Sequence, residues 1–184
     1  IKKALISVSD KKNLRNLLKT LTNLKIQLIS SGGTYKEIKR LNFECLEVSD
    51  YTNSPEILGG RVKTLHPKIH AGILSKRKNK SHMRDLKNNN FEEIDLVIVN
   101  FYPFEKTLKH TNNHLKIIEN IDIGGPTMVR AAAKNYNDVT VITSPNQYDE
   151  LINEIKKNKG STSFTFREKM SLEAFSETAY YDAV

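Results

Sequence analysis

The sequence has little cysteine, no tryptophan and no long hydrophobic run. Its single cysteine, Cys45, excludes an internal disulfide framework and any zinc site built from several cysteines, and it fits a reducing compartment. The longest apolar stretches, such as residues 96–99, are as long as a strand, whereas a bilayer span takes roughly 18–20 apolar residues. No charged-then-apolar signal segment follows the first residue. We therefore expect no membrane span, no export signal and a cytoplasmic location.

Positive charge exceeds negative charge, with 29 Lys and Arg against 21 Asp and Glu, a net charge of +8. Such an excess is compatible with nucleic-acid binding. However, the basic runs at 76–80 and 156–159 have no aromatic residues between their charges, and Lys and Asn recur along the whole sequence. We interpret the excess as solvated surface lysine and expect no nucleic-acid partner.

Apolar strands alternate with amphipathic helices along the 184 residues. Strands are predicted at residues 4–9, 26–30, 43–48, 94–100 and 139–142. Helices are predicted after an Asp10 N-cap, from near Thr34, within 76–90, around 115–121, at 126–133, around 148–155 and from 164 onward. Between residues 54 and 70 we expect a short helix and then a long functional loop. This alternation implies right-handed crossovers, a parallel sheet and one α/β domain over residues 1–184.

Six of the eight glycines occur in three pairs, at 32–33, 59–60 and 124–125. Three polar segments follow predicted strands: Ser7-Val-Ser-Asp-Lys11, Ser31-Gly-Gly-Thr34 and Asn100-Phe-Tyr102. The carboxyl ends of parallel strands share one edge, where ligands bind in open α/β sheets. The first two segments also begin helices, whose free N–H groups attract anions, and Lys11, Ser31 and Thr34 add side-chain donors. The sequence therefore predicts a phosphate-binding cradle.

Two common nucleotide-binding motifs are absent: the P-loop and the Gly-x-Gly-x-x-Gly turn of dinucleotide folds. His66 and His70 are four residues apart, but Pro67 between them disrupts the helix that would align two metal ligands. We expect no metal there, and we interpret Cys45 as a small filler residue.

The motifs of the sequence resemble those of the inosine monophosphate (IMP) cyclohydrolase domain, the N-terminal half of a bifunctional purine-biosynthesis enzyme whose other half is AICAR formyltransferase. The resemblance rests on the three segments above, on residues 174–182, and on Leu58-Gly-Gly-Arg-Val-Lys-Thr-Leu-His-Pro67, His70-Ala-Gly-Ile-Leu74, Asn100-Phe-Tyr-Pro-Phe104 and Ile121-Asp-Ile-Gly-Gly-Pro-Thr-Met-Val-Arg-Ala-Ala-Ala-Lys-Asn135. Lys12-Asn13 departs from the family's usual Thr-Gly.

The resemblance implies a methylglyoxal-synthase-like fold, a three-layer α/β/α sandwich with a mainly parallel central sheet. It implies a cyclic-amidine hydrolase that closes the ring of the formamido-imidazole-carboxamide ribotide FAICAR to IMP, the last step of de novo purine biosynthesis, without metal or organic cofactor. It also implies a homodimer, and that residues from about 164 lead towards a C-terminal formyltransferase domain. The full-length protein is then expected to have AICAR formyltransferase activity as well.

The resemblance nominates four catalytic residues: Lys63, Tyr102, Asp122 and Lys134. Lys63 and Tyr102 would polarise the formyl oxygen, while Asp122 and Lys134 would transfer protons, with Lys134 as the acid/base. It also nominates residues that line the nucleotide pocket: Ser9, Asp10, Lys11, Ser31, Gly32, Gly33, Thr34, Arg61, Val62, Thr64, Asn100 and Ile123.

Each catalytic candidate also has a structural interpretation. Lys134 could complement the negative end of a helix dipole, Tyr102 could be a core or interface aromatic, Asp122 could be a turn residue, and Lys63 could contact phosphate. Other functions on the same fold are a regulatory ligand-binding module and a methylglyoxal synthase acting on a triose phosphate. A regulatory module needs the phosphate cradle but not all four catalytic candidates.

Overall fold

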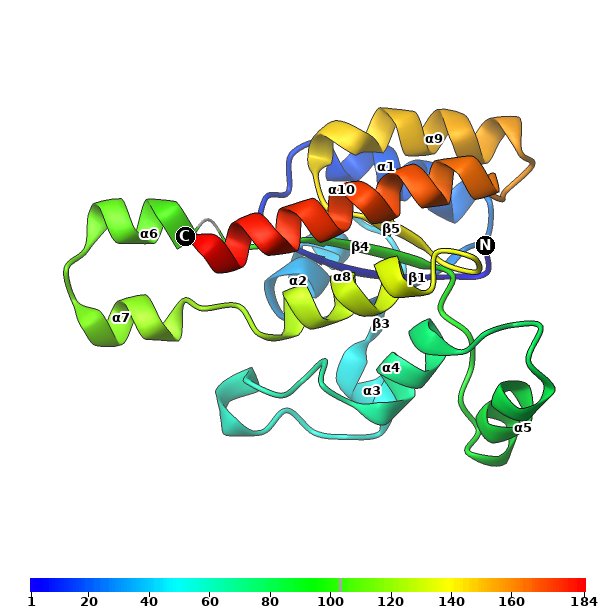
Figure 1. Cartoon of the computed structure of the whole chain (residues 1–184), viewed down its shortest axis with the longest axis horizontal. Helices are drawn as coiled ribbons and strands as arrows, with labels where there is room; N and C mark the ends of the chain where they lie inside the picture. Colours follow the sequence, from blue (N-terminus) through cyan, green and yellow to red (C-terminus); the bar gives the residue numbers. More distant parts are fainter. Residues whose placement is uncertain (103) are drawn as a thin grey trace.

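A computed structural model describes residues 1–102 and 104–184, and the strands within them form one parallel sheet in the order β3-β2-β1-β4-β5 (Figure 1). The strands are β1 (Lys3–Val8), β2 (Gln27–Ser30), β3 (Leu46–Glu47), β4 (Leu96–Asn100) and β5 (Thr140–Ile142). The chain runs outward from β1 to β3 and then returns to the other side of β1 for β4. The order therefore reverses at β1 and β4, and in open α/β sheets ligands generally bind outside the carboxyl ends of the strands at such a point.

All five predicted strands are present, and the predicted α/β class is confirmed. Residues 96–99 of β4 are buried, as expected for a central strand covered on both faces. The third strand is shorter than predicted because Val48 already begins a helix.

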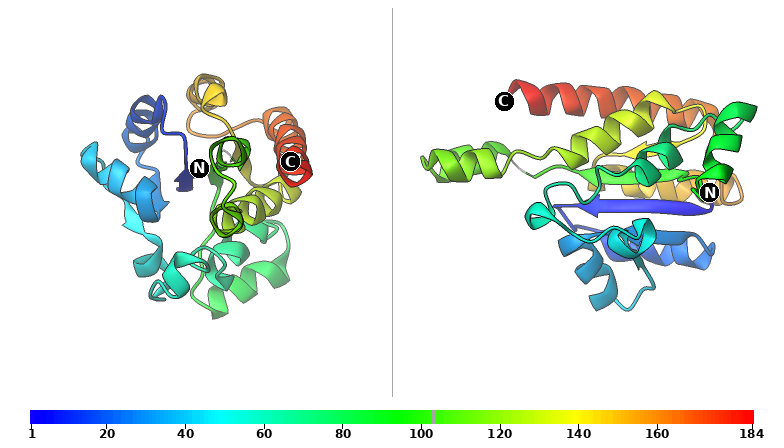
Figure 2. Two further views of the ribbon diagram at one scale, coloured as in Figure 1. Left: turned by 90° about the vertical axis from the view of Figure 1, so that its left-hand side faces the viewer. Right: turned by 90° about the horizontal axis from the view of Figure 1, so that it is seen from below.

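Helices cover both faces of the sheet (Figure 2). The longer ones are α1 (Leu14–Asn23), α2 (Gly32–Arg40), α4 (Pro67–Leu74), α5 (Lys80–Asn88), α8 (Gly124–Lys134), α9 (Tyr148–Lys157) and α10 (Phe164–Ala183). The shorter ones are α3 (Val48–Thr52), η1 (Leu58–Gly60), α6 (Phe104–His110), α7 (His114–Glu119) and η2 (Pro145–Gln147). Helix α8 packs on β4 and β5 and contacts α4 and α10, and α10 also contacts β5. Helix α1 packs beside α9, and α2 contacts β1 and β2.

Helix α1 begins later than the sequence predicted. Asp10 does not cap it, because the residue that precedes the helix is Asn13, in the left-handed region with φ 59°. The Asp10 carboxylate instead accepts a hydrogen bond from Lys12 N–H at 2.9 Å. Asp10 therefore shapes the turn after β1 rather than the helix.

The region between residues 54 and 70 also differs from the prediction. The short helix lies earlier, at Val48–Thr52, and Ser54 is not helical because Pro55 disfavours a helical conformation in the residue before it. The expected long loop ends at Pro67, which occupies the first position of α4, where its missing N–H costs nothing. His66 caps that helix: its Nδ1 accepts from Lys68 N–H at 3.1 Å.

None of the described helices is long and apolar enough to cross a membrane. The helices α6 and α7 project from the body as a hairpin beyond the carboxyl end of β4 (Figure 1). Pro103, part of the Asn100-Phe-Tyr-Pro-Phe104 motif, lies outside the described residues.

Candidate functional site

The turn after β1 is held by the side chain that ends β4. Asn100 Oδ1 accepts from Ser9 N–H at 2.7 Å and from Asp10 N–H at 2.9 Å, and its Nδ2 donates to the Asp10 carbonyl oxygen at 2.9 Å. Lys11 is exposed beyond this turn, and its Nζ donates to the Ser9 carbonyl oxygen at 3.3 Å. Two of the three segments predicted to meet at one edge thus contact each other directly.

The third segment opens α2 beside the same turn. Thr34 is buried, and its hydroxyl accepts from Val8 N–H at 2.9 Å and donates to the Val8 carbonyl oxygen at 3.0 Å. The single hydroxyl proton is therefore used within the fold, and the expectation that this hydroxyl is a free phosphate donor is wrong for this arrangement. The Ser31 hydroxyl makes no capping bond to α2, so it can serve a ligand at the helix start.

Lys63 extends from the loop before α4 to the start of α2. Its Nζ lies 3.0 Å from Glu56 Oε2, and a Cβ placed on Gly32 would lie 3.2 Å from the same nitrogen. A Cβ on Gly60, where φ is +88°, would lie 2.8 Å from Lys63 Cε. Members of two predicted glycine pairs therefore leave space for one lysine side chain, which brings its charge to the cradle.

The third glycine pair opens α8 and is packed equally closely. A Cβ on Gly124 would collide with Thr64 Oγ1, and Gly125 N–H donates to Asp122 Oδ1 at 2.8 Å. Burial raises the pKa of the Asp122 carboxyl above its ordinary 3.8, and the Gly125 N–H opposes that rise. The Asp122 N–H donates to the Tyr181 hydroxyl at 2.8 Å, so the last part of α10 supports this turn. The neighbouring residues Lys63 and Thr64 therefore link the starts of α2 and α8.

Two of the remaining candidates lie on exposed segments around this edge. Tyr102, after β4, and Ile123, before α8, are each 57% exposed. Arg61 pairs with Glu119 of α7 at 2.9 Å. These residues sit between the body of the protein and the hairpin.

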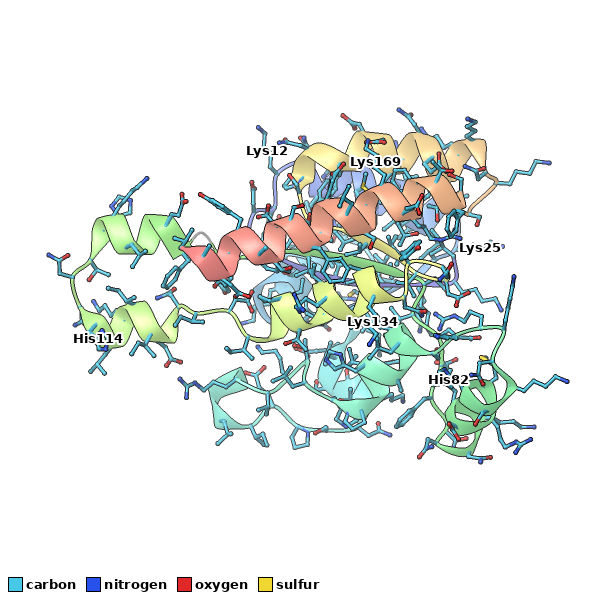
Figure 3. The ribbon with its side chains drawn as sticks, in the orientation of Figure 1. Lys12, Lys25, His82, His114, Lys134 and Lys169 are labelled. Carbon is cyan, nitrogen blue, oxygen red and sulfur yellow. The ribbon has the colours of Figure 1, made fainter. Side chains whose placement is uncertain are left out.

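Lys134 is not brought to the other three catalytic candidates within one chain. It is the last residue of α8, whereas Asp122 precedes the first, Gly124, and ten helical steps of 1.5 Å separate the two ends by about 15 Å. Figure 3 shows Lys134 at the end of α8 remote from the α6–α7 hairpin. Helices in a parallel α/β sheet run opposite to the strands, so the end of α8 lies at the amino edge of the sheet. The expectation that Lys134 shares a site with Lys63, Tyr102 and Asp122 is therefore wrong for a single chain.

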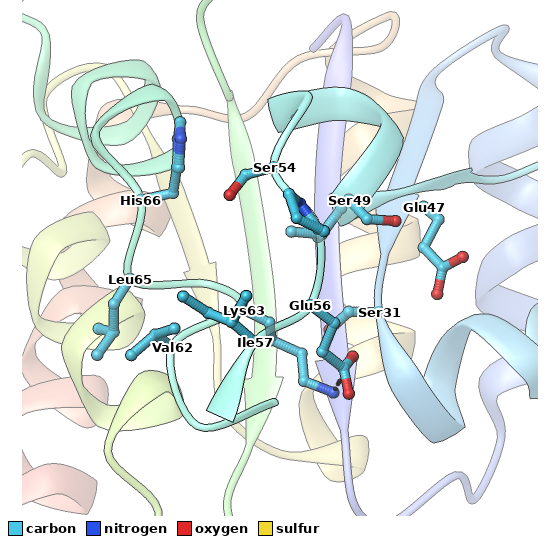
Figure 4. A pocket seen from close by; sticks show the side chains of 12 residues that line it. Ser31, Glu47, Ser49, Ser54, Glu56, Ile57, Val62, Lys63, Leu65 and His66 are labelled. Carbon is cyan, nitrogen blue, oxygen red and sulfur yellow. Dashed lines mark ion pairs between the residues drawn. The ribbon is translucent and has the colours of Figure 1, made fainter. Parts of the chain in front are cut away.

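A cavity of about 230 Å³ extends from the cradle towards β3 (Figure 4). Its lining comes from Ser31 of the cradle, from Glu47 of β3 and the start of α3, from the segment at 54–57, and from residues 62, 63, 65 and 66. Val62, Lys63, Glu56 and His66 are among its lining residues.

Some residues of this region escaped the sequence analysis. Glu56 lies on an irregular segment and carries no local signal. Tyr181 belongs to the 174–182 motif, but its partner Asp122 is 59 positions away, so the sequence does not predict the contact between them. His70 is one of two histidines four residues apart and begins the motif at 70–74, but neither pattern predicts its surroundings. Its Nε2 is buried with no hydrogen-bond partner among the described residues, and burial lowers its pKa. No cluster of three or more His, Cys, Asp or Glu side chains that could hold a metal occurs in the described part of the chain.

Comparison with known proteins gives two family matches. Residues 13–127 match the MGS-like domain model, and residues 132–184 match that of the AICARFT/IMPCHase bienzyme. The division between the two falls inside α8, so it does not coincide with a break between structural units.

The chain is also similar to curated proteins along its whole length. It is 51% identical over 183 residues to the bifunctional purine biosynthesis protein PurH of Persephonella marina, covering 100% of the chain and 35% of that protein. It is 55% identical over 181 residues to PurH of Prochlorococcus marinus (strain NATL2A), covering 97% of the chain and 35% of that protein. The crystal structure of ForH superposes with a TM-score of 0.88 at 31% identity, covering 99% of this chain and 95% of that one. The chain thus spans about a third of the length of the PurH relatives.

Proposed function

The chain belongs to the MGS-like domain family, and from that premise we propose that it acts in purine biosynthesis as an IMP cyclohydrolase. Its reaction is the dehydrative ring closure of FAICAR to IMP, in the cyclic-amidine hydrolase class. The observation that carries this proposal is the similarity to PurH proteins over the whole chain, at about half of the positions. A polar edge built for an anionic ligand is consistent with a ribotide substrate.

The chemistry joins two substituents of one molecule. The carboxamide nitrogen attacks the formyl carbon, a C–N bond forms, and the formyl oxygen becomes the hydroxyl of a tetrahedral intermediate. That oxygen then leaves as water with one proton from the carboxamide nitrogen and one from the formamido nitrogen, and a C=N bond completes the ring. Because both groups belong to one substrate, holding them in line supplies much of the rate; aligned intramolecular reactions reach effective molarities of about 10⁵–10⁸ M.

An amide is a weak nucleophile, so the site needs a donor at the formyl oxygen and a group that accepts the amide proton. In our proposal Lys63 and Tyr102 polarise the formyl oxygen. Asp122 accepts the proton, which its raised pKa favours. The exposed Lys11 side chain and the start of α2, with the Ser31 hydroxyl, bind the phosphate, while Ser9 and Asp10, whose N–H groups donate to Asn100, shape the turn that carries Lys11. Gly32, Gly33, Arg61, Val62, Thr64, Asn100 and Ile123 complete the proposed pocket.

Lys134 has no proton-transfer step in this scheme, because it lies at the far end of α8. A Lys134→Ala variant tests the role that the family resemblance implies. Turnover that falls to the uncatalysed background supports that role. Turnover near that of the parent chain would mean that Lys134 only complements the negative end of the α8 dipole.

The direct experiment incubates the purified chain with FAICAR and follows the hypoxanthine absorbance of IMP. We expect turnover that a Lys63→Ala variant loses while staying folded by circular dichroism, and that a metal chelator leaves unchanged. A folded parent chain without turnover would contradict the proposal, and if it still bound IMP it would favour the regulatory ligand-binding module. Production of methylglyoxal from dihydroxyacetone phosphate would favour the methylglyoxal synthase instead.

The proposal extends to the longer protein that the relatives represent. We propose that such a protein also has AICAR formyltransferase activity, that residues from about 164 lead towards that portion, and that the protein is a homodimer. A longer protein that produces IMP from AICAR and a formyl donor, and that sediments as a dimer, supports these points.

A further inference from the structure

Glu56 holds the side chain of Lys63 in the cavity beside the cradle. The Lys63 ammonium lies 3.0 Å from Glu56 Oε2, and both side chains line the cavity (Figure 4). The side chain of Lys63 is 28% exposed and that of Glu56 is 49% exposed, so the carboxylate is the more accessible partner. A bound ligand can therefore reach and compete with this pair.

The surroundings of Lys63 explain why it takes a carboxylate partner. Its Nζ approaches the position that a Cβ would take on Gly32, at the first turn of α2. The positive end of a helix dipole lies there, and a cation beside it is unfavourable unless an anion compensates it. Glu56 supplies that negative charge from residues 53–57, a segment without regular secondary structure that follows α3.

A phosphorylated ligand supplies the same negative charge. In the proposed function the ribotide binds at the start of α2 and Lys63 turns to the reacting groups. A phosphate in that place lies close to the Glu56 carboxylate, and two anions in one small cavity repel each other. The ligand-free and ligand-bound states therefore favour different positions of Glu56.

We propose that Glu56 is a built-in counter-ion that occupies Lys63 in the ligand-free site and must release it when the anionic ribotide binds. This inference rests on the proposed function and adds a residue that weakens ligand binding. Replacing Glu56 by Gln keeps the size of the side chain and removes both the ion pair and the repulsion. Half-exposed ion pairs are modest in strength, so we expect the Kd for IMP to fall by about threefold to tenfold.

The test measures the Kd for IMP by isothermal titration calorimetry for the parent chain, Glu56→Gln and a matched control, Glu150→Gln. Glu150 pairs with Lys169 at 2.7 Å on α9 and α10, away from the cavity, and its replacement makes the same change in net charge. Tighter binding by Glu56→Gln alone supports the inference. An equal gain in both variants points to net charge and overturns it, as does unchanged or weaker binding by Glu56→Gln, which would mean that Glu56 only positions Lys63.

Hydrogen exchange gives a second readout that a positioning role would not produce. We expect the backbone amides of Asn53, Ser54, Glu56 and Ile57 to exchange faster in the parent chain when IMP is bound, because Glu56 is released. The same amides in Glu56→Gln should exchange fast with or without IMP. Slower exchange of these amides on IMP binding would overturn the inference. A parent chain that neither binds IMP nor turns over FAICAR would instead contradict the proposed function itself.

Discussion

The side-chain amide of Asn100 forms two hydrogen bonds with the backbone of Asp10. Its Oδ1 accepts from the Asp10 N–H and its Nδ2 donates to the Asp10 carbonyl oxygen, each at 2.9 Å. These bonds join the residue that ends β4 to the turn that follows β1, at the point where the strand order reverses. The shape of the proposed phosphate cradle therefore depends on a side chain 90 positions from the backbone that it holds.

An Asn100→Asp variant tests the role of these two hydrogen bonds. The substitution replaces the donor by a carboxylate oxygen facing the Asp10 carbonyl, so we expect the turn to shift and the KM for FAICAR to rise by about tenfold. Asn89→Asp is the matched control, because Asn89 Nδ2 also donates to a backbone carbonyl, that of Asp85, but on α5 away from the cradle. A KM unchanged in both variants would show that substrate binding does not depend on the hydrogen bonds between Asn100 and Asp10.

The Thr34 hydroxyl is predicted to be a structural group. Thr34→Val removes the partner of the N–H and of the carbonyl oxygen of Val8 at a buried position, and should lower the free energy of unfolding by about 1–3 kcal/mol. Thr34→Ser keeps the hydroxyl and should recover most of that loss. Urea unfolding followed by circular dichroism measures both, and equal stability of the two variants would contradict the assignment.

Two glycines of the site should respond to alanine in opposite ways. Gly124→Ala places a methyl group against Thr64 Oγ1 and should destabilise the fold by about 1–3 kcal/mol. Gly33→Ala points into open space on a helix, has no positive φ, and should stabilise the fold by about 0.4–1 kcal/mol. Thermal unfolding of the two variants checks the difference. A stabilising Gly124→Ala would show that the Thr64 side chain moves aside at little energetic cost.

Asp122 should lower stability while supporting turnover. Because burial raises the pKa of the folded carboxyl above 3.8, the folded state favours the protonated form, and stability is lost as pH rises through that raised pKa. Asp122→Asn keeps an oxygen for Gly125 N–H, so at pH 7 it should unfold at a higher urea concentration than the parent chain yet lose FAICAR turnover. A variant that keeps its turnover would exclude Asp122 as the proton acceptor.

His70 should make stability depend on pH in the opposite direction. Burial lowers its pKa below 6.5 in the folded state, so the unfolded chain binds the proton first as pH falls. The stabilising contribution is present above about pH 6.5 and decreases as pH falls towards the lowered pKa. Urea unfolding at pH 7.5 and at pH 5.5 should show a smaller difference for His70→Gln than for the parent chain. An identical difference would show that another group carries the effect.

The residues of the sequence were sufficient to predict the strands and their meeting edge. Alternating apolar segments located all five strands, and parallel strands must bring residues 9–11, 31–34 and 100–102 to one edge. The element boundaries were less predictable. Pro67 began a helix inside the expected loop, and Asn13 rather than Asp10 preceded α1, because local turn geometry competes with periodicity there.

Packing between distant segments decided how the site is assembled. The sequence alone indicated glycine pairs, but only the folded chain shows Lys63 passing over Gly32 and Gly60, Thr64 against Gly124, and Tyr181 supporting Asp122. The length of α8 separates Lys134 from that group. The Thr34 hydroxyl donates its proton to the Val8 carbonyl oxygen, although the sequence had predicted that it would donate to a phosphate. Periodicity and strand order follow from local residue chemistry, whereas the partner of each side chain depends on how loops from different crossovers fill the same space.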